Sequence, residues 1–136
     1  MKYNFEIAEP VEVTLPNGVK YSQPTGLFIN NQFIQSHNHK TIDVENPATQ
    51  ETIVAVSTGT VEDVEYAVES AERAFKDTNW ATQDPKVRAK ALFKLADLVE
   101  ENIDLFSAVE TANNGKTLAV SAGDVQIGID CLSAAA

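Results

Sequence analysis

The sequence has a single cysteine, no apolar run long enough to cross a membrane and no excess of basic residues. Its 136 residues carry 10 Lys and Arg against 20 Asp and Glu, a formal net charge of −10. One cysteine excludes an internal disulfide framework and is typical of a reducing compartment. An acidic chain has no basic stripe for phosphates, which argues against a nucleic-acid partner. We therefore expect a cytoplasmic protein with neither a nucleic-acid partner nor a membrane partner.

The motifs that mark many enzymes are also missing. Neither GxGxxG nor GxxxxGK[ST] occurs, so no phosphate-cradling loop is predicted. Cys131 has Asp130 beside it in an apolar segment, which favours a packed thiol over an activated nucleophile. His37 and His39 are two residues apart in a polar segment that supplies no third metal ligand. The residues alone therefore predict a globular domain, with no catalytic and no cofactor-binding residue assigned.

What is present begins with signals for short β-hairpins. Pro16-Asn17-Gly18 follows alternating apolar and polar residues, which predicts a turn between two strands. Asn30-Asn31 separates two short apolar segments, and Asn tolerates the positive φ of tight turns. Thr41–Val44 and Thr52–Val56 are rich in β-branched residues and predict a further pair of strands.

Helix signals follow from residue 60 onward. Thr60 and Asp63 have the spacing of a capping box, in which each side chain bonds the other's backbone N–H. Asp84-Pro85 predicts a second helix start, because proline has no N–H to leave unpaired there. Asn102 predicts a restart with Asp104 in the new first turn. Asn113-Asn114-Gly115 predicts the end of that third helix.

The segment after Gly115 is apolar on nearly all sides, which predicts a buried helix. Lys116, directly after the Asn-Gly stop, is accounted for by the attraction of a cation to a helix C-terminus. The apolar positions that predict the helical faces are Val61, Val64, Ala67, Val68, Ala71, Ala74 and Phe75, then Ala89, Leu92, Ala96 and Val99, then Ile103, Phe106, Val109 and Ala112.

Several segments, taken in order, resemble the amino-terminal part of the NAD(P)-dependent aldehyde dehydrogenases. The family's opening hairpin, its NPATGE turn, its second helix, its ETLDNGK segment and the start of its next helix all have similar counterparts. The stretch LPNGVKYSQPTGLFIN is similar to fungal members in particular. The counterparts are LFINNQFI at 27–34, VENPATQE at 44–51, LADLVE at 95–100, ETANNGK at 110–116 and Asp124-Val125.

The resemblance implies an α/β fold, the amino-terminal part of a Rossmann-like cofactor domain, with short β hairpins followed by about four helices. It implies an arm at residues 1–26 and a truncated cofactor-domain portion at residues 27–136. The parent would oxidise aldehydes to carboxylic acids with NAD or NADP, as a homo-oligomer. The family's catalytic and cofactor-binding residues lie further along a longer chain, so none is carried over here. The alternative is a non-catalytic module that docks on full-length subunits.

One binding site is implied within this chain. Many members of the family hold an alkali cation between a strand end and the Asp that precedes Asn-Gly-Lys. The matching positions are Val44, Glu45 and Asn113, so the resemblance implies a weak metal site with an amide in place of the carboxylate. A second departure is Gln50, which stands where the family usually has Gly.

Overall fold

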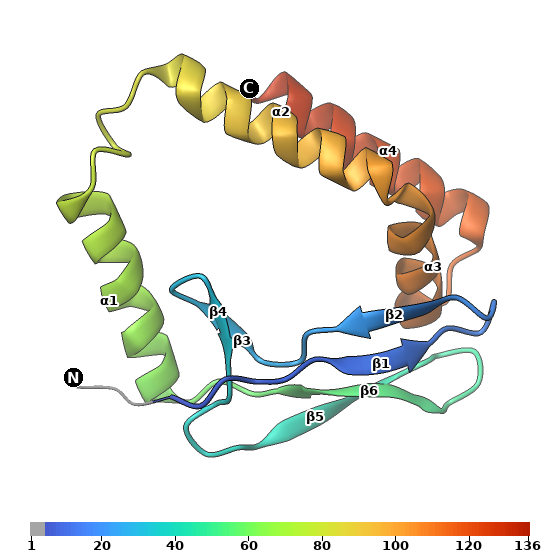
Figure 1. The fold of residues 1–136 in the computed structure, drawn as a ribbon. Helices are drawn as coiled ribbons and strands as arrows, with labels where there is room; N and C mark the ends of the chain where they lie inside the picture. Colours follow the sequence, from blue (N-terminus) through green and yellow to red (C-terminus); the bar gives the residue numbers. More distant parts are fainter. Residues whose placement is uncertain (1–4) are drawn as a thin grey trace. The chain divides into compact units, whose positions relative to one another are not determined.

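Six short strands and four helices follow one another along residues 5–136, the part of the chain that the computed structural model describes (Figure 1). Residues 1–4, the start of the predicted arm, lie outside that part. The contacts divide the chain into two compact units, each of which is described by itself. The first unit contains residues 5–14, 20–45 and 52–81, and the second contains residues 15–19, 46–51 and 82–136.

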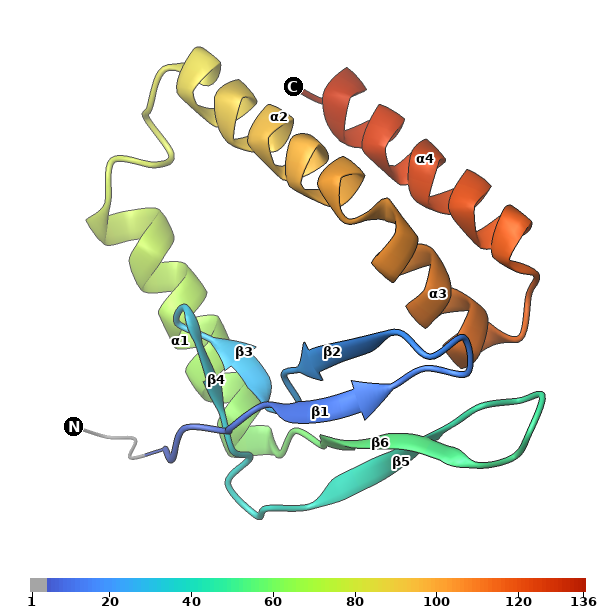
Figure 2. The ribbon, with the colours of Figure 1, turned by 45° about the vertical axis from the view of Figure 1, so that its right-hand side comes forward.

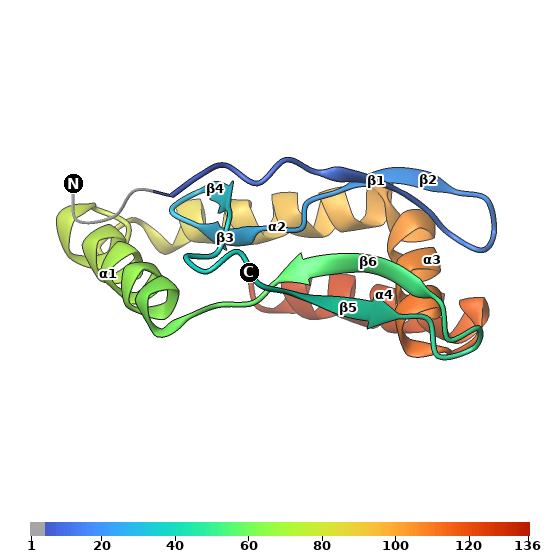
Figure 3. The same cartoon turned by 90° about the horizontal axis from the view of Figure 1, so that it is seen from below.

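The strands form three separate antiparallel pairs, each with two strands, as the turn signals predict. Figure 3 shows the longest pair, β5 and β6, as a two-stranded ribbon. Its register shifts by one residue between Val44 and Glu45, which is a β-bulge or irregularity at the end of β5. The pairs are β1 (Val11–Thr14) with β2 (Lys20–Gln23), β3 (Leu27–Ile29) with β4 (Gln32–Ile34), and β5 (Thr41–Glu45) with β6 (Thr52–Ser57).

The turn residues have the backbone conformations that their sequence requires. Asn30 and Asn31 have φ values of 52° and 62°, so the tight β3–β4 turn uses the tolerance of Asn for positive φ. Gly18 has a φ of 84° in the turn between β1 and β2. Gln50 also has a positive φ, of 61°. A glycine would adopt that conformation without steric cost, so Gln50 is sterically less favourable here than the glycine that the family usually has.

The α1 helix (Val61–Asp77) of the first unit begins where the capping box predicts. Asp63 and Ser70 are its buried residues. Its apolar stripe is exposed: Val61, Val68 and Phe75 have exposed fractions of 72%, 60% and 66%. The apolar periodicity therefore identified the helix correctly, but residues 5–136 bury little of its apolar stripe.

The second unit contains α2 (Pro85–Glu101), α3 (Ile103–Asn114) and α4 (Leu118–Ala134). Figures 1 and 2 show α2 and α4 side by side, and α3 also packs on α4. Small side chains dominate the buried positions, which allows the helices to approach closely. These positions are Ala96, Ser107, Ala108, Ala112, Ser121 and Ile129.

The ends of α2 and α3 lie where the sequence signals predict, but the Asn102 side chain bonds a different helix end from the one expected. The Asp84 carboxylate accepts a hydrogen bond of 2.9 Å from the Lys86 backbone N–H, and Gly115 ends α3 with a φ of 84°. Asn102 marks the restart between α2 and α3, but its side chain does not cap α3. It donates instead to the Leu98 carbonyl oxygen at 2.8 Å, on the α2 side.

The start at Asp124 that the resemblance implied is wrong: the last helix begins at Leu118, in the segment after Gly115 where the residues predict a helix, because the Thr117 side chain caps it and accepts from the Val120 N–H. It is also not buried all round: Ile127 is 61% exposed and Cys131 is exposed. Within the described chain, α2 and α3 cover only one side of α4, so its outer apolar residues stay open.

Candidate functional site

The most deeply placed charged group of the first unit is the Asp63 carboxylate, on a residue that is 1% exposed. It accepts hydrogen bonds from the backbone N–H groups of Thr60, at 2.7 Å, and His37, at 3.1 Å. The Thr60 hydroxyl in turn accepts from the Asp63 N–H at 3.3 Å. The carboxylate therefore caps α1 and fixes the loop at His37.

The adjacent Glu62 is at the surface, and hydrogen bonds from its own backbone N–H and from the Thr60 side chain lower its pKa. Such a shift is expected for a carboxylate in the first turn of a helix, where N–H groups favour the charged form.

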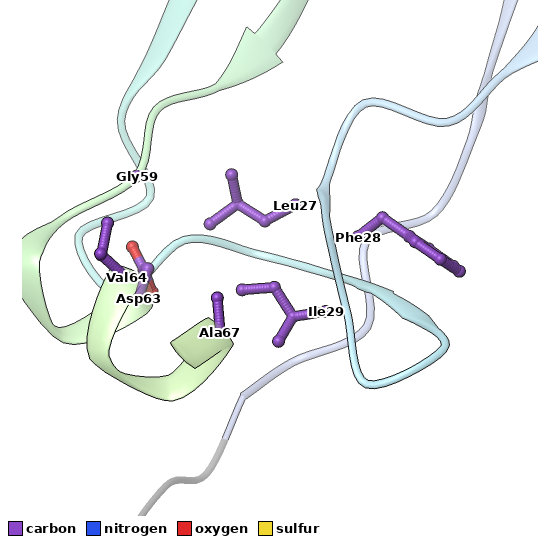
Figure 4. A pocket seen from close by; sticks show the side chains of 7 residues that line it. All are labelled: Leu27, Phe28, Ile29, Gly59, Asp63, Val64 and Ala67. Carbon is purple, nitrogen blue, oxygen red and sulfur yellow. The ribbon is translucent and has the colours of Figure 1, made fainter. Parts of the chain in front are cut away.

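A hollow of about 220 Å³ lies between β3 and the start of α1 (Figure 4). Leu27 and Ile29 point toward it, whereas Phe28 points away, because successive strand residues alternate. Phe28 packs instead on Phe33, with ring centroids 4.8 Å apart. The walls are apolar except for Asp63, whose oxygens are already bonded. The hollow has the character of a packing site for an apolar side chain. Its lining residues are Leu27, Phe28, Ile29, Gly59, Asp63, Val64 and Ala67.

The second unit has a charged cluster at the corner between α3 and α4. The Lys116 ammonium lies 2.5 Å from a carboxylate oxygen of Glu110 and 2.5 Å from one of Asp124. Its hydrogen bonds to Asp124 and then to Glu110 raise the pKa of Lys116. The sequence explained this lysine by the helix dipole alone. The structure adds two specific acidic partners, so a free nucleophilic or basic amine is not available at this position.

Buried hydroxyl groups lie in the interface between α3 and α4. Ser121, which is 0% exposed, and Thr111 share a hydrogen bond of 2.9 Å between their hydroxyl oxygens. Ser107 donates to the Ile103 carbonyl oxygen at 2.6 Å. No activating base accompanies either serine in these contacts, and the hydroxyl groups satisfy each other or a helix carbonyl within the packed helices.

The residues of the predicted cation site are found at element ends. Val44 and Glu45 close β5 in the first unit, on either side of its register shift. Asn113 is the penultimate residue of α3 in the second unit, two residues before the left-handed Gly115. The helix-ending role of this segment is confirmed by the 2.9 Å bond from the Gly115 N–H to the Thr111 carbonyl. The cation site itself stays a prediction.

Within the described residues, the other candidates, His37, His39 and Cys131, have no further partner for metal binding or nucleophilic chemistry. Over residues 5–136 no group of three or more His, Cys, Asp or Glu residues could hold a metal ion. His37 contributes its backbone N–H to Asp63, and His39 lies in the same loop with a φ of 54°. Cys131 is exposed, which corrects the expected packed thiol. None of the helices in this part of the chain is long and apolar enough to cross a membrane.

Comparison with known proteins shows to which protein family the chain belongs. The model of the aldehyde dehydrogenase family matches residues 33–136. An aldehyde dehydrogenase of Davidiella tassiana is 43% identical over 122 residues, which are 90% of this chain and 24% of that protein. The chain therefore belongs to the aldehyde dehydrogenase family, and it spans about a quarter of the length of such relatives.

More distant members agree with this assignment. Phenylacetaldehyde dehydrogenase of Pseudomonas fluorescens is 41% identical over 98 residues, covering 72% of this chain and 20% of that protein. Among solved structures, betaine aldehyde dehydrogenase of Staphylococcus aureus in complex with NAD+ superposes with a TM-score of 0.78 at 33% identity. The likeness covers 80% of this chain and 22% of that one. The predicted α/β fold, with antiparallel strand pairs followed by four helices, is thereby confirmed.

The ion pairs of Lys116 were not predictable from residue spacing. Glu110 and Asp124 lie six residues before and eight residues after the lysine, and neither spacing is that of neighbours on one helix. Only the sharp corner formed by Gly115 and the cap at Thr117 brings the three charges together. The one available signal was the presence of charged residues on both sides of the predicted helix corner.

Proposed function

We propose that this chain is the amino-terminal portion of an NAD(P)-dependent oxidoreductase that oxidises aldehydes to carboxylic acids. The observation that carries the proposal is the identity of 43% over nearly the whole chain to an aldehyde dehydrogenase about four times as long. The complex of the S. aureus enzyme with NAD+ supports a nicotinamide cofactor for the parent. A homo-oligomer in the cytoplasm is part of the same proposal.

Within that parent, this portion acts as a scaffold and not as the catalytic centre. The polar groups inside its two units are committed to caps, to a helix interface and to ion pairs. Residues 5–136 present no Gly-rich turn that could cradle a pyrophosphate, so they do not fit the cofactor, and no step of the reaction is assigned to them. The nucleophile, the general base and the cofactor site belong to the remaining length of the parent.

The test compares the purified 136-residue chain with the natural polypeptide that carries this sequence. With acetaldehyde and either NAD+ or NADP+, the parent should form reduced nucleotide, and the 136-residue chain should form none. By calorimetry, the chain should bind dinucleotide more weakly than about 1 mM, roughly −4 kcal/mol. Turnover by the chain alone would refute the scaffold role, and lack of turnover by the parent with any aldehyde would refute the activity.

A second candidate is a stand-alone module that docks on full-length aldehyde dehydrogenase subunits. The exposed apolar residues of α4, such as Val120 and Ile127, favour it, because an interaction surface of this kind needs a cover. The discriminating measurement is co-elution of the 136-residue chain with a full-length subunit in size-exclusion chromatography. Stable co-elution supports the module, and separate elution favours the portion of a longer enzyme.

The weak alkali-cation site at Val44, Glu45 and Asn113 is also a proposal. Asn113 offers one oxygen acceptor without the negative charge of the family's Asp, so electrostatic attraction for a cation is reduced. We expect Asn113→Asp to increase the stabilisation of the parent by potassium or sodium. The measurement is the melting temperature in increasing KCl against a bulky organic cation at equal ionic strength.

The matched control is Asn114→Asp, which adds the same charge one residue away on the same helix end. A larger potassium response in Asn113→Asp than in both the control and the wild type supports the site. Identical responses of the three proteins would show that Asn113 only helps to end α3.

A further inference from the structure

The corner between α3 and α4 holds one positive charge between two negative charges. Lys116 belongs to neither helix, whereas Glu110 lies in α3 and Asp124 in α4. Both carboxylate oxygens are 2.5 Å from the same ammonium nitrogen, so they are within about 5 Å of each other. The lysine side chain is 21% exposed, less than either partner, which limits the screening of its charge.

The position of the lysine makes the two helices respond to it differently. It follows the C-terminus of α3, whose partial negative charge attracts a cation. It also directly precedes Thr117, the cap of α4, whose N-terminal partial positive charge repels a cation. The first turn of α4 contains no acidic residue. Asp124, in the second turn, is therefore the group that holds the lysine to α4.

The backbone of the corner leaves little freedom of its own. Gly115 has a φ of 84°, and a Cβ at this position would lie 2.9 Å from Cγ of Pro47. Beneath the ion pairs, the hydrogen bond between Thr111 and Ser121 joins α3 to α4. Gly115 therefore sets the backbone conformation of the turn, whereas the pairing of the three charges can change when one of them is removed.

We propose that Lys116 is a charge latch that holds the first two turns of α4 against α3. With the latch closed, one cation bridges two carboxylates and offsets the repulsion between them across the helix interface. Loss of the positive charge leaves Glu110 and Asp124 facing each other unpaired, which favours opening of this end of α4. The packing of α2 on α4 lies outside the latch and should persist.

The experiment is amide hydrogen exchange, read by mass spectrometry or NMR, in the natural polypeptide that carries this sequence. In Lys116→Gln the amides of Ser121–Asp124 should exchange about tenfold faster, as expected when a hydrogen bond between charged groups is lost. Lys116→Arg keeps the charge and should exchange like the wild type. In the wild type, added KCl should accelerate the same amides by screening the pairs.

The decisive variant combines Lys116→Gln with Glu110→Gln and Asp124→Asn. Because this variant removes the repelling charges as well, its exchange should return toward that of the wild type. The latch is overturned if the triple variant exchanges as fast as Lys116→Gln alone, or if Lys116→Gln leaves the amides of Ser121–Asp124 unchanged. It is also overturned if the α2 amides around Ala96 accelerate equally, since that result would show general loss of packing.

Discussion

Replacing Asp63 by alanine is expected to lower the free energy of unfolding by about 3 kcal/mol, because a helix cap and a buried charged acceptor are lost together. The carboxylate accepts from the N–H groups of Thr60 and His37, and its residue is 1% exposed. Both donors would be left without this partner. Urea denaturation of the natural polypeptide, followed by circular dichroism, measures the change.

Asp63→Asn removes the negative charge of the side chain but keeps its size and shape. The amide keeps one oxygen acceptor, so the loss should fall between those of the wild type and Asp63→Ala. Glu65→Ala is the matched control, since Glu65 is an exposed acid on the same helix. Its effect should stay within about 0.5 kcal/mol. Equal losses in Asp63→Ala and Glu65→Ala would contradict the structural role of the buried carboxylate.

Gly26→Ala is the second substitution with a large expected effect. A Cβ at this position would lie 2.4 Å from the Ala8 Cβ and 2.6 Å from the Ile34 carbonyl oxygen. The segment around Ala8 runs along β4 here, with a 3.0 Å hydrogen bond from the Ala8 N–H to the Phe33 carbonyl. Relief of the clash requires the backbone to move, so we expect a loss of about 3 kcal/mol or more. Thermal melting of the natural polypeptide measures it.

Two further variants make this result specific. Gly59→Ala is the control, because a Cβ there meets no atom within 4 Å, and it should change stability by no more than about 1 kcal/mol. Adding Ala8→Gly to Gly26→Ala removes one of the two clashes and should restore only part of the stability. Full tolerance of Gly26→Ala would show that the N-terminal segment does not pack on β4 in solution.

Local structure in this protein was predictable wherever a few neighbouring residues determine the backbone. The pair Asn30-Asn31 tolerates positive φ, and Thr60 with Asp63 closes a reciprocal cap. Asp84-Pro85 starts α2, and Gly115 ends α3 in the left-handed conformation. Each of these features depends on contacts within about four residues, which the order of the sequence already contains. The order of these segments also carried the family resemblance.

Burial and charge pairing were not predictable in the same way. Apolar periodicity predicted α1, and apolar residues on nearly all sides predicted a buried α4, yet Val68 of α1 is 60% exposed and Ile127 of α4 is 61% exposed. Periodicity reports which side chains share a face, whereas burial depends on what packs against that face. The Cys131 thiol was predicted to be packed but is exposed, for the same reason.

The sequence by itself determined the elements, the turns and the family of this protein, because these depend on residues close together in the chain. The tertiary structure decided the rest: which helix faces are covered, that Asp63 is bonded to the loop at His37, and that Lys116 joins Glu110 to Asp124. Those contacts join groups brought together by the folded path of the chain, and no local pattern of residue types encodes that path.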